Sequence, residues 1–395
     1  MKKLSRLIGV TALVAIALLV FAGCDPLLGL FGGEPTVVTS ELEGTYDDLT
    51  LESGNLYRVT DDVQFDGLLT IEEDVYIEFD SDTWLYIRDG GSINAIGTAD
   101  NPIVMRGSTE TPGFWQGVFI RSSNVTNTME HVNIQHTGSS EIDGDIAAIV
   151  LEGFYGGAAN LSNVSVSEAV GYGLTVQNGA TLQSFSSNSF ASIDGSPVKI
   201  HVSEVHEIDS ASTFDATNTN NYIEVEGGTL EETVTWSALA GSVPYYVNEN
   251  TTIGASLTIE AGVIMEFGSA VRFFISGDGG IVADASAGDP IVFTGAEQVA
   301  GYWRGIEINS SDVTNLMDNV EISYAGHPTG FSGGDTGNML LDGFYQGYLT
   351  LRNSTVSNGA AHGIVVENGG TLVDSGITFT NVGDDNVGYQ DVVYE

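Results

Sequence analysis

The chain has 395 residues, and its 11 lysines and arginines face 53 aspartates and glutamates, which gives a formal charge of −42. This balance excludes nucleic acid as a partner, because phosphate binding needs clustered cations. Intrinsic disorder is excluded too, since 42% of the residues are hydrophobic.

Residues 1–23 have the pattern of a secretion signal. Lys2, Lys3 and Arg6 form a charged start, and an apolar run follows from residue 7 to residue 21. The run is somewhat short for a membrane-spanning helix, and no stop-transfer flank follows it. We expect residues 1–23 to be removed on export, which takes the formal charge to −45 because three cations leave with them.

Cys24 is the single cysteine of the chain, so it cannot form an intramolecular disulfide. The segment VFAGC, which ends at Cys24, resembles the lipobox of bacterial lipoproteins, although Phe21 departs from the usual Leu. The resemblance implies that Cys24 is lipidated and anchors an exported protein to a bacterial membrane, in the periplasm or on the cell surface. Residues 24–45 then form a Gly- and Pro-containing tether. A plain signal peptide with an incidental cysteine is the alternative.

The remaining chain contains a long internal repeat. LLTIEEDVYIEF from residue 68 returns as SLTIEAGVIMEF from residue 256, a shift of 188, and GFWQGVFI returns as GYWRGIEI at the same shift. GLTVQNGATL from residue 173 returns as GIVVENGGTL at a shift of 190. We expect two copies of one unit, residues 46–220 and residues 221–395, in one continuous structure.

Within each copy, short runs of β-branched and aromatic residues alternate with polar residues and are separated by Gly, Asn and Asp. This two-residue period predicts strands with one buried face. Turn clusters recur about every 20–25 residues, a spacing typical of β-solenoids. Gly and Asn suit the corners of such a coil because they tolerate left-handed backbone conformations.

The phrases LTIEAGVIMEFGSA, GDPIVFTGA, GYWRGIEI and HGIVVENGGTL resemble the right-handed parallel β-helix repeats of bacterial envelope proteins, within the pectate-lyase-like superfamily. The resemblance covers nearly everything after residue 45. It implies an all-β chain, a single-stranded right-handed parallel β-helix built from two duplicated units. It says little about function, because the superfamily includes lyases, hydrolases and adhesins.

A catalytic site is not evident in the sequence. The polygalacturonase pattern of paired Asp, His-Gly and Arg-Ile-Lys is missing, and a pectate lyase needs a basic residue beside calcium-binding carboxylates. The candidate bases are Arg121, Lys199, Arg304 and Arg352, and none lies in a recognisable acidic cluster of the sequence. We therefore name no catalytic residue and expect no enzyme activity.

Two repeated aromatic motifs are candidates for glycan contact. Trp115 and Trp303 each lie in a G-[FY]-W-x-G motif, and Tyr155 and Tyr345 lie in matching G-F-Y motifs. Flat aromatic faces can stack on sugar rings. The alternative for the two tryptophans is packing inside the coil, which the frequency of aromatic ladders in solenoid cores favours. The glycines beside the two tyrosines indicate a turn and partial exposure.

Acidic turns make calcium the one cofactor to consider. Glu141, Asp143 and Asp145 alternate in the segment EIDGD, and alternate carboxylates can supply hard oxygen ligands. The alternative is a solvated acidic loop, because the segment matches neither the twelve-residue EF-hand loop nor the nonapeptide repeat of calcium-binding β-rolls.

The sequence thus predicts a lipid-anchored envelope protein that binds, adheres or acts as a scaffold without catalysis, with polysaccharide or an envelope surface as its partner. A long solenoid face suits extended ligands. We expect a monomer. The alternative function is a polysaccharide lyase or glycoside hydrolase of the same superfamily, and salt adaptation is a further explanation of the acidity.

Overall fold

The computed structural model describes residues 37–367 and 369–390, and the described residues belong to one compact unit. The expected leader, Cys24 and most of the tether lie outside the described residues. Within the described ranges, no helix is long and apolar enough to cross a membrane.

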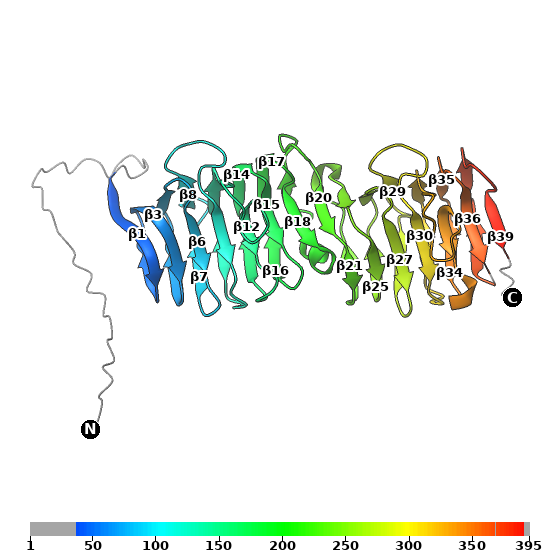
Figure 1. Cartoon of the computed structure of the whole chain (residues 1–395), viewed down its shortest axis with the longest axis horizontal. Helices are drawn as coiled ribbons and strands as arrows, with labels where there is room; N and C mark the ends of the chain where they lie inside the picture. The colour runs from blue at the N-terminus through cyan, green and yellow to red at the C-terminus, as the bar shows by residue number, and fades with distance from the viewer. Residues whose placement is uncertain (1–36, 368, 391–395) are drawn as a thin grey trace, which may run out of the picture. The chain divides into compact units, whose positions relative to one another are not determined.

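The fold is a parallel β-helix, in which short strands of successive coils pair in parallel (Figure 1). One ladder of paired strands, here called the long ladder, runs through most of the described chain. Its strands are β6 (Trp84–Ile87), β9 (Gly117–Ile120), β12 (Ala147–Leu151), β15 (Tyr172–Val176), β18 (Val198–His201), β20 (Ile223–Glu226), β23 (Tyr245–Val247), β26 (Ile264–Phe267), β29 (Ile291–Gly295), β32 (Val320–Ser323), β35 (Thr355–Ser357) and β38 (Thr378–Thr380).

Two side ladders complete the coils of the first half. The first side ladder contains β5 (Tyr76–Phe79), β8 (Ile103–Gly107), β11 (Val132–Gln135), β14 (Ser165–Val170), β17 (Ser189–Asp194) and β19 (Thr213–Phe214). The second side ladder contains β2 (Leu49–Leu51), β4 (Leu68–Ile71), β7 (Ser92–Ile96), β10 (Thr128–Glu130), β13 (Ala158–Ser162) and β16 (Thr181–Ser186).

Two further side ladders complete the second half. The third side ladder contains β21 (Gly228–Leu230), β24 (Thr251–Ile253), β27 (Arg272–Ser276), β30 (Gly305–Asn309), β33 (Gly337–Leu341), β36 (His362–Glu367) and β39 (Val387–Gln390). The fourth contains β22 (Val234–Trp236), β25 (Ser256–Ile259), β28 (Gly280–Asp284), β31 (Leu316–Asp318), β34 (Tyr348–Arg352) and β37 (Thr371–Ser375).

The first coils are joined by longer strands. β1 (Val38–Tyr46) pairs with β3 (Leu56–Phe65), and β3 in turn pairs with both β5 and β6. β3 therefore links the first side ladder to the long ladder.

Alternate residues of each strand point into the coil, as the two-residue period predicts. In β5, for example, Ile77 and Phe79 are buried while Tyr76 and Glu78 are partly exposed. Cross-strand register then stacks like positions into rows along the interior. One such row in the first side ladder is Ile77, Met105, Ile134, Val166, Phe190 and Phe214. The long apolar core follows from these rows, and the strands need no helix to cover them.

Matching details recur in the two halves at the shifts found in the sequence. Asn163 and its equivalent Asn353 both have left-handed backbone, with φ of 52° and 47°. Asp82 and its equivalent Ala270 do the same at 61° and 59°. These repeated corners support the proposed duplication, which stays a prediction.

The junction between the halves departs from regular coiling. Among the described strands, the first side ladder ends at β19 and the second at β16, and only the long ladder continues from β18 through β20 to β23. The 3₁₀ helix η2 (Val202–Glu207) lies between β16 and β21 and contacts both. Two shorter 3₁₀ helices, η3 (Ala240–Ser242) and η4 (Gly343–Tyr345), occupy corners.

The junction also offsets the two halves. β26 is the equivalent of β5 in the sequence repeat, yet β26 pairs within the long ladder and β5 within the first side ladder. Equivalent strands thus belong to different ladders.

Candidate functional site

The two tryptophans proposed for glycan contact lie inside the coil and are fully buried. The ring of Trp115 stacks on Phe79, with centroids 3.8 Å apart, and its Nε1–H donates to the carbonyl of Gln135 at 2.7 Å. Trp303 stacks on Phe267 at 4.1 Å, and its Nε1–H likewise donates to a main-chain carbonyl at 2.8 Å. Neither indole presents a face to solvent, so the core alternative describes both residues.

The two G-F-Y motifs, in contrast, form exposed turns, as the flanking glycines suggested. The first aromatic turn consists of Phe154 and Tyr155, which are 87% and 43% exposed, and the second consists of Phe344 and Tyr345, which are 66% and 54% exposed. In each pair the ring centroids are 4.9 Å apart and the rings are nearly perpendicular. The chain therefore presents the same large apolar group to solvent twice.

An acidic side chain fixes the backbone of each aromatic turn. The carboxylate of Glu152 accepts hydrogen bonds from the N–H groups of Phe154 and Tyr155, at 3.0 and 2.8 Å. Asp342 accepts one from the N–H of Phe344 at 2.9 Å. Both carboxylates are buried and directly follow a strand, β12 or β33. The backbone that carries the exposed rings is thus held by hydrogen bonds to buried carboxylates.

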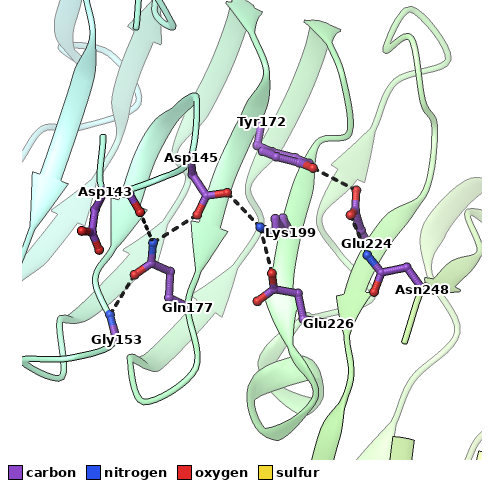
Figure 2. Close-up of polar contacts among 9 residues, drawn as sticks. All are labelled: Asp143, Asp145, Gly153, Tyr172, Gln177, Lys199, Glu224, Glu226 and Asn248. Atoms are coloured by element: carbon purple, nitrogen blue, oxygen red, sulfur yellow. Dashed lines mark hydrogen bonds and ion pairs between the residues drawn. The ribbon is translucent and has the colours of Figure 1, made fainter. Parts of the chain in front are cut away.

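The acidic segment considered for calcium is divided by the fold. Glu141 and Asp143 are exposed, whereas Asp145 is buried and close to Lys199 (Figure 2). Asp145 Oδ1 lies 2.8 Å from the ammonium of Lys199, and Oδ2 accepts a hydrogen bond from Gln177 at 3.1 Å. Within the described residues, no group of three or more His, Cys, Asp or Glu side chains is arranged to hold a metal ion.

Lys199, the only lysine beyond residue 3, is the centre of a polar cluster at the junction (Figure 2). Its ammonium lies 2.8 Å from Glu226 as well as from Asp145, and 5.6 Å from the ring centroid of Tyr172. The Tyr172 hydroxyl donates to Glu224 at 3.2 Å. An open pocket of about 380 Å³, lined in part by Tyr172 and Lys199, borders the cluster.

The electrostatics of this cluster argue against proton transfer at neutral pH. Burial opposes the charge of Lys199, but hydrogen bonds to Asp145 and Glu226 outweigh it and raise the pKa of Lys199. Burial and the charge of Glu224 raise the pKa of Tyr172 to about 12. Lys199 and Tyr172 therefore stay protonated, whereas a lyase base must be able to release its proton.

The prediction that no candidate base lies in an acidic cluster is wrong for Lys199. Its partner Asp145 comes two coils earlier in the chain, and its partner Glu226 comes one coil later. The usable signal was the coil spacing, since Lys199 pairs across the long ladder with Thr175 of the coil before and Glu224 of the coil after. The other three candidate bases are arginines, and Arg121 lies beside Tyr86 and Tyr155.

The fold defines the class of this protein, a right-handed parallel β-helix. Residues 43–147 match the family model of the pectate-lyase-like beta helix domain, so this part of the chain is similar to such a domain. The resemblance to that superfamily is thereby confirmed. No curated protein matches the chain.

Proposed function

We propose that the chain is a lipid-anchored cell-envelope protein that binds polysaccharide without cleaving it, through its two aromatic turns. The observation that carries the proposal is the repeated exposure of Phe154–Tyr155 and Phe344–Tyr345 on turns whose backbone is hydrogen-bonded to a buried carboxylate. Single exposed apolar side chains are common, but adjoining exposed rings that form an apolar patch often mark an interaction site. A ring held in place before binding loses little conformational entropy on contact, so it is well suited to stack on a sugar.

The surroundings of the first aromatic turn support this use. The guanidinium of Arg121 lies 3.3 Å from the ring centroid of Tyr155 and holds that ring from one side. Arg121 is itself held by an ion pair with Asp89 at 3.0 Å. The formal charge of −42 favours neutral or cationic glycans over anionic ones.

The non-catalytic part of the proposal is supported by the protonated Lys199 and Tyr172. The alternative, a polysaccharide lyase or glycoside hydrolase, predicts that a glycan panel incubated with the protein yields reducing ends or unsaturated uronides. Such products would contradict binding alone. The lipid anchor is supported by the sequence around Cys24, and we expect Cys24→Ser to abolish incorporation of labelled palmitate.

A glycan array probed with the full chain tests the aromatic turns. For any glycan retained, the double variants Phe154→Ala/Tyr155→Ala and Phe344→Ala/Tyr345→Ala should each weaken binding about tenfold or more, because central aromatic contacts dominate interface energies. Melting temperatures should change little, since these side chains are exposed.

The chain offers a matched control for this experiment. Ile96, at the end of β7, and Val299, between β29 and β30, are 43% and 55% exposed at corners of the coil other than those that carry the aromatic pairs. Ile96→Ala and Val299→Ala should leave glycan binding unchanged. Unaltered binding by the aromatic double variants would overturn the proposal.

A further inference from the structure

Two loops fold over the outside of the coil, one in each half. The first cover loop, residues 138–146, packs Ile142 against outward aromatic side chains of β6 and β9. The second cover loop, residues 327–336, packs Phe331 against outward aliphatic side chains of β33 and β36. Each contains a Gly-Asp pair, and the two aspartates, Asp145 and Asp335, are equivalent at the shift of 190 found in the sequence.

In the first half each carboxylate oxygen of Asp145 has a polar partner. Asp145 receives a hydrogen bond from the amide of Gln177 and an ion pair from the ammonium of Lys199. Because Asp145 is only 6% exposed, it depends on these two partners for its charge.

In the second half both partners are replaced. Glu367 is the equivalent of Gln177 at the same shift, so Asp335 faces another acid, and a hydrogen bond between the two requires that one of them is protonated. Gly388 stands in the place of Lys199, since Lys199 pairs with Thr175 across its ladder and Gly388 pairs with the equivalent Val365. The backbone position that supplies the ammonium in the first half thus carries no side chain in the second.

Among the described residues, the second cover loop therefore lies over more acidic side chains than cations that could neutralise them. Glu367 is 4% exposed, and burial, the hydrogen bond with Asp335 and the charges of Asp335, Asp342 and Glu307 raise the pKa of Glu367 to about 8. At neutral pH the Asp335–Glu367 pair therefore holds a proton, whereas in the first half the hydrogens that face Asp145 come from Gln177 and Lys199.

Glu307 on β30 gives an independent sign of a missing donor. Its side chain is fully buried, and Oε2 pairs with Arg272 at 3.0 Å and accepts from the N–H of Ser332 in the cover loop. Oε1 has no hydrogen-bond partner within the described residues, and the same holds for Oδ1 of Asn309, further along the same strand. Buried oxygens without donors are costly and rare in folded proteins.

We propose that Asp335 and Glu367 form a binding site for a primary ammonium group of a ligand, which occupies the place that the Lys199 ammonium occupies in the first half. Asp335 is partly exposed at the edge of the cover loop and gives access to the buried Glu367. An ammonium group has three donors, and the site offers acceptors. The proposal is independent of the aromatic turns and goes beyond glycan binding.

Proton linkage follows from this arrangement. A bound ammonium stabilises the charged form of Glu367, so it displaces the proton between the two acids. Binding should then release up to one proton at pH 7 and strengthen from pH 6 to about pH 8, where Glu367 ionises without help. The facing charges of Glu307 and Arg272 largely cancel, whereas Asp342 adds to the attraction. Among the described side chains, His362 on β36, whose Nδ1 would lie 3.1 Å from a Cβ atom added at Gly388, is a further titratable group near the site.

Calorimetric titration of the full chain with n-butylammonium at constant ionic strength tests the proposal, with tetramethylammonium as the matched cation that donates no hydrogen bond. We expect n-butylammonium to bind and tetramethylammonium to fail, with proton release seen as a heat that depends on the buffer. Equal binding of the two cations would overturn the proposal. Glucosamine in a parallel titration distinguishes an amino sugar from a simple amine by its affinity.

Variants locate the site. Asp335→Asn should weaken n-butylammonium binding at least tenfold, whereas Asp278→Asn, in an exposed turn after β27, should leave it unchanged. Glu367→Gln, which recreates the first half's Gln177, should retain binding but lose its dependence on pH between 6 and 8. Unchanged affinity in Asp335→Asn, or unchanged pH dependence in Glu367→Gln, contradicts the proposal, and the second variant decides if the first fails to fold.

Discussion

The single ammonium group of Lys199 pairs with two acidic side chains, Asp145 and Glu226. Its side chain is 18% exposed and that of Asp145 is 7% exposed, so their pair is shielded from water and salt. Glu226, at the same distance from the ammonium, is 28% exposed. Removing the lysine would leave Asp145 buried without a cation, which costs far more than losing a surface ion pair.

We predict that Lys199→Met lowers the free energy of unfolding by about 3 kcal/mol, as measured by urea denaturation. The matched control is Arg88→Met, because the Arg88–Asp66 pair is 45% exposed on both sides and should contribute less than about 1 kcal/mol. Equal effects of the two substitutions would show that the Lys199 pair is no more than a surface contact.

The pH dependence follows from the same residue. Because the folded-state pKa of Lys199 is raised above its usual 10.5, the stabilisation is complete below about pH 10.5 and is lost as pH rises through the folded-state value. Lys199→Met should therefore be less stable than the wild type at pH 8, with the difference shrinking above pH 10.5.

Residue types alone could not reveal this cluster. The sequence shows Lys199 in SPVKIHV, far from any acidic run, and only the pairing register of β18 with β20 brings it to the level of Glu224. That register crosses the junction, where coil lengths change. The burial of Trp115, by contrast, was within reach, because an apolar ring in a repeated strand-adjacent motif fits the interior of a coil.

At the scale of elements, η2 replaces a strand. β16 would need a neighbouring strand to accept its N–H groups, and instead Glu204 of η2 accepts from the N–H of Leu182 at 3.0 Å through its side chain. The Glu204 carboxylate thus accepts a hydrogen bond that a main-chain carbonyl of a neighbouring strand would accept in a continuous sheet.

We predict that Glu204→Ala destabilises the fold by about 1.5 kcal/mol, because it leaves the N–H of Leu182 without an acceptor beside a buried side chain. Glu204→Gln retains an acceptor oxygen and should lie close to the wild type in urea denaturation. Amide exchange at Leu182 should accelerate in the alanine variant alone. An alanine variant as stable and as protected as the glutamine variant would refute the role given to Glu204.

The sequence predicted the strands better than their connections. Repeated runs such as LTIE correspond to β4 and β25, and the alternation of buried residues follows the predicted period. The η2 helix and the ladder offset were not predicted, because both depend on which strand lies beside which after an irregular coil. Local patterns carry no such information.

At the scale of the whole molecule, the acidity acts on stability. The formal charge of −42 means that the excess acidic side chains repel one another in the folded state. Salt screens that repulsion, with a Debye length of about 10 Å at 0.1 M. We predict that the melting temperature rises as NaCl increases from about 0.01 M to about 0.5 M. Glycerol at equal osmolality is the control for effects other than screening. A melting temperature indifferent to NaCl would remove salt adaptation as an explanation of the acidity.

The junction crossed by a single ladder bears on how the chain unfolds. In a stacked array, stability is close to a sum of terms within coils and between neighbouring coils. Where the backbone pairing of β18, β20 and β23 alone continues, the coupling between neighbours is weaker than where three ladders continue together. Cooperativity should therefore break there, so that the residues before η2 and those after β21 open as two separate units. A pull applied to the ends of this β-helix would extend it in two steps.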